Sequence, residues 1–171
     1  LTVSVNLSLA TLSDTNQADR ITEIVRSAGL DPLHMVLEIT ETAAMTDVAP
    51  LENLARLRIK GFGLSVDDYG TGFSNLQQLT RVPFTELKID RSFVSNCSSD
   101  PSSLAIVESS VEMARRLRLR CIAEGVETQA DLDALEATSC DFAQGYFFAK
   151  PMDERAFQEY CTTNRTNRRR S

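Results

Sequence analysis

The stretch Gly63-Leu64-Ser65-Val66-Asp67-Asp68-Tyr69-Gly70 decides the fold, because a short apolar segment here ends in two adjacent carboxylates and a glycine turn. Five other short apolar segments also end in a polar residue, at residues 2–6, 35–38, 86–90, 121–124 and 141–144. The stretches between them mostly have the spacing of amphipathic helices. Alternating strands and helices with polar strand ends predict an α/β (β/α) barrel with its active site on the C-terminal rim.

The pattern gives six strand–helix units, whereas a complete barrel has eight and about 250 residues. We therefore expect residues 1–160 to be one barrel domain lacking about two units, which would precede Leu1. Asp100 and Thr128 are expected to cap helices, and a last helix is expected from about Asp153 to Tyr160. Residues 161–171 hold four arginines, so we expect a solvated, disordered basic tail there.

Bulk properties restrict the function. The chain has 171 residues and a net charge of -6, which argues against a broad DNA-binding surface. Its four cysteines form no Cys-x-x-Cys pair, so a zinc site or a disulfide framework is not expected. The sequence has no apolar run near the roughly 20 residues of a membrane span. We expect a cytoplasmic protein with no membrane segment.

The polar strand ends are candidates for binding divalent cations and a phosphodiester. Asp67 and Asp68 repel each other and would gain from a cation between them, although turn chemistry also favours Asp before Gly. Lys88, between two apolar residues, faces either the rim or an acidic partner. Glu38 and Asn6 offer oxygen ligands, but Asn6 is also typical of a turn or helix cap. Glu41, just beyond the strand end, could hold a neighbouring loop. Alternatively, it could be a glutamate at the start of a helix.

Glycines follow two of these strand ends, in Glu124-Gly125-Val126-Glu127 and Gln144-Gly145-Tyr146. A glycine at such a position permits close approach of the backbone to a ligand. Each motif is unspecific alone. Asp90, Glu127 and Gly145 are the residues that we expect to contact a substrate.

As a set, these motifs resemble the EAL-domain phosphodiesterases of bacterial second-messenger signalling. The resemblance runs from Leu1 to about Tyr160, and the matching stretches are residues 5–8, 37–41, 67–72, 87–90, 124–127, 144–146 and 150–152. The Glu-Ala-Leu motif that names the family is absent. In relatives it supplies a metal ligand on the first strand, so its absence predicts weak metal binding and an open barrel edge.

The resemblance implies a modified (β/α)₈ barrel that hydrolyses cyclic di-GMP to linear pGpG with two Mg²⁺ or Mn²⁺ ions. Lys88 would position the attacking water, and Gln144 would lie beside it. Glu124 would be a metal ligand or a base. Glu41 would support the loop after Asp68, which links the site to a homodimer interface, and a sensory or receiver domain would lie upstream. The implied metal ligands are Asn6, Glu38, Asp67, Asp68 and Glu124.

Two alternatives stay open at this point. The chain could be a catalytically inactive relative that binds cyclic di-GMP and regulates a partner. It could also be a barrel enzyme that acts on a different phosphoester. The inactive relative would bind cyclic di-GMP without hydrolysing it, so an assay of turnover distinguishes it from the phosphodiesterase. A panel of phosphoester substrates would identify an enzyme that acts on a different phosphoester.

Overall fold

A computed structural model describes residues 1–40, 48–71 and 76–168. Its six strands form one sheet in chain order, and every neighbouring pair is parallel. The prediction of six strands in barrel order is confirmed. The strands are β1 (Val3–Asn6), β2 (Met35–Thr40), β3 (Gly63–Tyr69), β4 (Glu86–Ile89), β5 (Arg120–Glu124) and β6 (Phe142–Gln144).

Helical segments connect successive strands, as parallel strand pairs require. The 3₁₀ turns are η1 (Leu9–Ser13) and η2 (Pro32–His34). The α-helices are α1 (Gln17–Ser27), α2 (Val48–Ile59), α3 (Leu76–Arg81), α4 (Arg91–Val94), α5 (Pro101–Leu117), α6 (Gln129–Thr138) and α7 (Glu154–Arg168).

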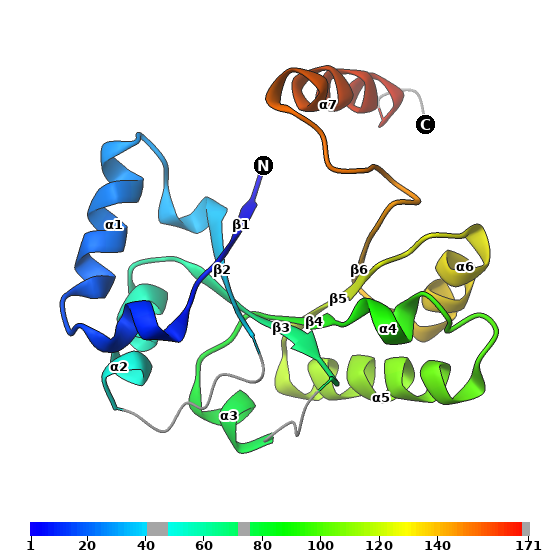
Figure 1. Cartoon of the computed structure of the whole chain (residues 1–171), viewed down its shortest axis with the longest axis horizontal. Coiled ribbons are helices and arrows are strands. Elements are labelled where there is room, and N and C mark those ends of the chain that lie inside the picture. The colour runs from blue at the N-terminus through cyan, green and yellow to red at the C-terminus, as the bar shows by residue number, and fades with distance from the viewer. Residues whose placement is uncertain (41–47, 72–75, 169–171) are drawn as a thin grey trace.

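The sheet curves into part of a barrel, with the edge strands β1 and β6 well apart from each other (Figure 1). The apolar strand residues face the surrounding helices. Leu37, Leu64 and Leu87 are at most 4% exposed, and they belong to the same buried cluster as Leu57 of α2 and Val107 of α5. Because side chains alternate along a strand, the polar residues of these strands face the inside of the curve.

Two of the predicted caps are confirmed. The Asp100 carboxylate accepts hydrogen bonds from the backbone N–H groups of Ser102 and Ser103, both at 3.1 Å. The Thr128 hydroxyl accepts one from the N–H of Asp131 at 3.1 Å. These caps satisfy N–H groups that a helix start leaves without partners, and they fix where α5 and α6 begin.

The last helix is longer than the sequence indicated. It runs from Glu154 to Arg168, so residues 161–168 are helical where a disordered tail was expected. The charge of this segment suggested a tail, but it contains neither glycine nor proline, the residues that most strongly interrupt a helix. Asp153 also caps its start, since its Oδ1 accepts the N–H of Ala156 at 2.9 Å. In Figure 1, α7 stands apart from the sheet.

Within the described ranges, no helix combines the length and apolar character needed to cross a membrane.

A buried asparagine joins α2 to the segment that follows β1. Asn53 is 1% exposed, and its Nδ2 donates to the carbonyl oxygens of Leu12 and Asp14, both at 2.8 Å. Its Oδ1 accepts the N–H of Ala18 at 3.1 Å. Three backbone groups far from α2 in sequence therefore depend on this one side chain.

We predict that Asn53→Ala lowers the free energy of unfolding by about 3 kcal/mol, because buried backbone groups lose their partners. Asn16→Ala is the matched control, since Asn16 is exposed and makes no side-chain cap, and it should cost less than about 0.5 kcal/mol. Urea titration measures both. Equal losses in the two variants would contradict this role for Asn53.

Candidate functional site

A lysine at the centre of the sheet holds three carboxylates from three other strands. The Nζ atom of Lys88 on β4 lies 2.9 Å from Glu38 Oε1 on β2 and 2.9 Å from Asp67 Oδ1 on β3. It lies 2.6 Å from Glu124 Oε1 on β5. The Lys88 side chain is 6% exposed. Of the two positions predicted for Lys88, the structure therefore shows the one beside acidic partners.

The electrostatics follow from burial and these contacts. Burial alone would lower the pKa of Lys88, but the hydrogen bonds to Glu124, Glu38 and Asp67 outweigh it and raise this pKa above its ordinary value. Burial raises the pKa of Glu124, while Lys88 opposes that effect. The ammonium is therefore held in its charged form, and Glu124 has a greater affinity for a proton than an exposed glutamate.

A β-bulge lets Asp67 and Asp68 contribute to the same site. Val66 pairs with Leu87 and Tyr69 pairs with Ile89, so β3 uses one more residue than β4 over this stretch. Asp68 takes the extra position in a left-handed conformation with φ of +57°. A bulge re-aims side chains that regular alternation would send to opposite faces. This explains how adjacent carboxylates converge at the strand end.

Asp67, Asp68 and Glu124 form an acidic cluster in which one ligand atom from each lies within 4.8 Å of the others. Burial raises the pKa of Asp68, and the neighbouring charges of Asp67 and Asp90 raise it further. Carboxylates that crowd in this way are stabilised by a cation, and their oxygens suit hard divalent ions.

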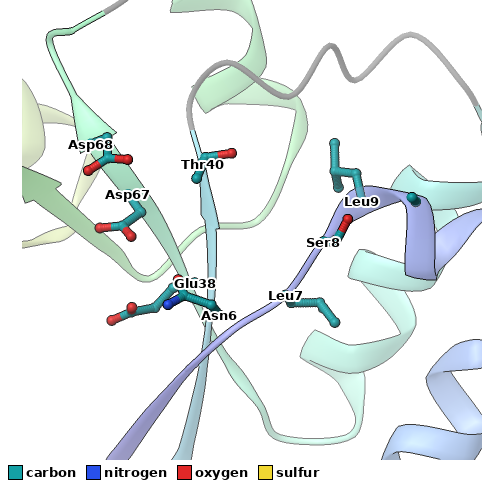
Figure 2. Close-up of a pocket in the computed structure, with 9 residues that line it drawn as sticks. Asn6, Leu7, Ser8, Leu9, Glu38, Thr40, Asp67 and Asp68 are labelled. Atoms are coloured by element: carbon teal, nitrogen blue, oxygen red, sulfur yellow. The ribbon is translucent and has the colours of Figure 1, made fainter.

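Asn6 and Glu38 extend the site toward β1. They are register partners on adjacent strands, and with Asp67 and Asp68 they line a cleft of about 560 Å³. Figure 2 shows the carboxylates of Glu38, Asp67 and Asp68 on the same side of their strands, with the Asn6 amide beside Glu38. Ser8, Leu9 and Thr40 complete the wall nearest β1 and β2.

On the opposite side, Gln144 of β6 lies beside Glu124 of β5. The two are register partners, and Gln144 Nε2 donates to Glu124 Oε1 at 3.3 Å. Glu124 thus contacts both the lysine and the amide, and the site continues from β1 to β6.

The glycines after the strand ends make room for neighbouring backbone. A Cβ on Gly145 would lie 2.2 Å from the carbonyl oxygen of Val126, and one on Gly125 would lie 2.3 Å from the Cβ of Arg91. Their small size therefore lets the rim loops after β4, β5 and β6 pack directly on one another. We expected this space to serve a ligand; in the structure, other loops fill it.

The remaining predicted residues have distinct positions. Asp90 caps α4, accepting the N–H of Ser92 at 2.9 Å. Burial would raise the pKa of Asp90, but its hydrogen bonds with Ser92 outweigh this and lower it. Glu127 is exposed in the loop after β5. Glu41 lies outside the described residues, as do residues 72–75 of the loop expected at a dimer interface.

A second polar layer beneath the site was not predicted. Ser65 and Glu86 precede Asp67 and Lys88 by two residues, so alternation directs them to the same inner face. Glu86 forms an ion pair with Arg120, and burial raises the pKa of Glu86 although Arg120 opposes the effect. The period-two spacing of polar residues in these strands is the sequence signal that could have revealed this layer.

Comparison with known proteins agrees with this geometry. The model of the EAL domain matches residues 1–151. The chain belongs to the EAL domain family. Cyclic di-GMP phosphodiesterase RocR of Pseudomonas aeruginosa is 38% identical over 163 residues, which are 95% of this chain and 42% of RocR. The chain thus spans less than half the length of this relative.

Solved EAL-type structures confirm the partial (β/α)₈ barrel. The PaMucR phosphodiesterase in complex with c-di-GMP superposes with a TM-score of 0.83 at 38% identity, covering 91% of this chain and 64% of that one. BlrP1 of Klebsiella pneumoniae, solved with manganese and cyclic di-GMP, gives 0.80 at 30% identity, covering 88% of this chain and 39% of that one.

We predict that Lys88→Met lowers the unfolding free energy of the metal-free protein by about 3 kcal/mol or more near pH 7, because it leaves buried carboxylates without their cation. Without Lys88, the pKa of Glu124 rises further above its unfolded value. Such a group favours folding only while it is protonated, so the deficit should be larger at pH 8 than at pH 5.

Lys60→Met is the control for this experiment, since Lys60 forms an ion pair with Asp19 that is partly exposed to solvent. Its removal should cost less than about 1 kcal/mol. Urea titrations at several pH values measure both variants. A Lys88→Met deficit that shrinks as the pH rises would contradict the role assigned to Lys88.

Proposed function

We propose that this chain belongs to a metal-dependent phosphodiesterase that hydrolyses cyclic di-GMP to linear pGpG. The observation that carries the proposal is the acidic cluster of Asp67, Asp68 and Glu124 beside the charged Lys88. The names of RocR and of the PaMucR complex support the substrate. The manganese complex of BlrP1 supports the use of a divalent ion.

The donor set fits two hard divalent ions such as Mg²⁺ or Mn²⁺. The set consists of carboxylate oxygens and one amide oxygen. Lys88 neutralises only one of the negative charges, so the site keeps an excess of negative charge that divalent ions could balance. When bound, such ions neutralise charge on a phosphate and make water a stronger nucleophile near neutral pH. The residues that would hold them are Asn6, Glu38, Asp67, Asp68 and Glu124.

Three side chains would have separate roles in the hydrolysis. Lys88, held charged, would donate a hydrogen bond to the attacking water and stabilise negative charge on the phosphate. Glu124, with its raised pKa, would accept a proton from that water. Gln144 would hold Glu124 in position. The water oxygen bonds to phosphorus as the bond to the ribose oxygen breaks in line, which opens the ring to a linear dinucleotide.

We also propose a dimer partner and an upstream domain for this barrel, and roles for three further residues near the site. A homodimer would form through the loop after Asp68 and the helices near it, and a sensory or receiver domain would precede the barrel. The length of RocR, of which this chain covers 42%, supports further polypeptide. Asp90 and Glu127 would lie along the path of the substrate, and Glu41 would support the loop after Asp68.

We predict that Asp68→Asn weakens Mn²⁺ binding by about tenfold or more, because it removes one carboxylate from the acidic cluster. Asp133→Asn is the control, since Asp133 is exposed on α6 and pairs only locally with Gln129. Titration calorimetry with Mn²⁺ measures both variants. If the two variants bound Mn²⁺ with equal affinity, whether weakened or unchanged, the result would argue against a metal site at the end of β3.

In the longer polypeptide proposed above, we expect cyclic di-GMP hydrolysis that EDTA abolishes and Mn²⁺ restores. Lys88→Ala should lower kcat by about 100-fold or more, because a charged hydrogen-bond donor to the reacting atoms is lost. Lys60→Ala should retain activity. Chromatography of the nucleotide products measures turnover, and hydrolysis undiminished by EDTA would refute the metal role.

The same assay tests the alternative of an inactive binding module. A module of that kind would bind cyclic di-GMP and leave it intact after prolonged incubation with Mn²⁺. Inactive relatives are expected to have lost metal ligands at these strand ends. This chain retains the ligands that the resemblance implies for β1, β2, β3 and β5, which favours the enzyme.

A further inference from the structure

Two cysteines meet at the end of the sheet opposite the acidic cluster. Cys121 is the second residue of β5, and Cys140 lies two residues before the start of β6. The two strands pair in parallel from Ile122 and Phe142 onward, which places both cysteines where the strands begin. They are 19 positions apart along the chain, so their proximity is a consequence of the fold and not of local sequence.

The Cys140 sulfur lies between the two strands. Its Sγ is 3.5 Å from the carbonyl oxygen of Cys121 and 3.3 Å from that of Phe142. The Cys140 thiol therefore donates to the backbone of Cys121 on the neighbouring strand, which brings the two cysteine residues side by side. A disulfide requires two cysteines that lie close together on neighbouring segments of the chain, and the starts of β5 and β6 place Cys121 and Cys140 in this way.

The two thiols differ in reactivity. Cys121 is 1% exposed on the side of β5 that faces the core, whereas Cys140 is only partly buried. The hydrogen bond from Cys121 lowers the pKa of Cys140, although burial and the Asp141 carboxylate oppose the effect. The same contact, with burial, raises the pKa of Cys121. Cys140 is thus the more accessible thiol and the one that more readily becomes a thiolate, the form that reacts with oxidants.

We propose that Cys140 and Cys121 are a redox-active pair, in which Cys140 reacts with a hydroperoxide and Cys121 then closes a reversible disulfide between β5 and β6. The Cys140 thiolate attacks the peroxide oxygen, the O–O bond breaks, and an alcohol or water leaves as Cys140 becomes a sulfenic acid. Cys121 then gives up its proton, its sulfur attacks the Cys140 sulfur, and the S–O bond breaks with release of water. Two thiols lose two electrons, which the peroxide gains.

The cross-link would act on strands that carry the site. Cys121 precedes Glu124 by three residues, and Cys140 precedes Gln144 by four. A disulfide would therefore fix the beginning of the β5–β6 pair whose far end presents these two side chains. A reversible disulfide is typical of redox-sensing thiols in reducing compartments.

The test is oxidation of the chain with hydrogen peroxide, followed by alkylation of the remaining thiols and peptide mapping by mass spectrometry without reduction. We expect a peptide linked through Cys121 and Cys140, an intact mass lower by two hydrogen atoms, and recovery of both thiols with dithiothreitol. Cys140→Ser should abolish the link, whereas Cys97→Ser and Cys161→Ser should preserve it.

Two results would overturn the proposal. One is recovery of Cys121 and Cys140 as alkylated thiols while Cys97 or Cys161 is oxidised. The other is accumulation of Cys140 sulfinic acid with Cys121 still alkylated, which would mean that Cys121 does not close the bond. The wild-type chain alone decides between these results and the expected one, so the test does not depend on folding of the variants.

Discussion

The contact of the Lys88 ammonium with three carboxylates is the interaction on which the site depends. Glu38, Asp67 and Glu124 come from β2, β3 and β5, with the lysine on β4 between them. Burying three carboxylates without a cation would be prohibitive. The single lysine makes their burial possible and still leaves an excess of negative charge, which is the condition that favours divalent cations. The same side chain therefore explains how the metal-free sheet tolerates the site and why the site would take up metal.

Departures from regular structure complete the arrangement. The bulge at the end of β3 turns Asp68 toward Asp67, at the cost of a left-handed backbone conformation for a non-glycine residue. Gly125 and Gly145 let the rim loops pack without intervening side chains, which holds Glu124 and Gln144 at a fixed spacing. Each feature is local, but together they decide which oxygens can approach one ion.

Much of this could be predicted from the sequence, because alternation of apolar and polar residues is a local signal. It predicted the six strands, their order and two helix caps, and it gave an acidic partner as one of two possible neighbours of Lys88. The bulge could not be predicted, since it depends on the register between β3 and β4. Two further contacts, of Gly145 with Val126 and of Cys140 with Cys121, join segments that are distant along the chain. They depend on which strands are neighbours and in what register, which local sequence patterns do not determine. The extension of α7 was not predicted, because the charge of residues 161–168 is typical of a tail although the segment lacks helix-breaking residues.

Crystals soaked in Mn²⁺ and measured at the manganese absorption edge would test the central claim most directly. The account predicts an anomalous peak within coordination distance of Asp67, Asp68 and Glu124, accompanied by movement of these carboxylates relative to the Lys88 ammonium. A peak that lies only elsewhere on the protein, or none at saturating Mn²⁺, would contradict the claim that these strand ends form one metal site.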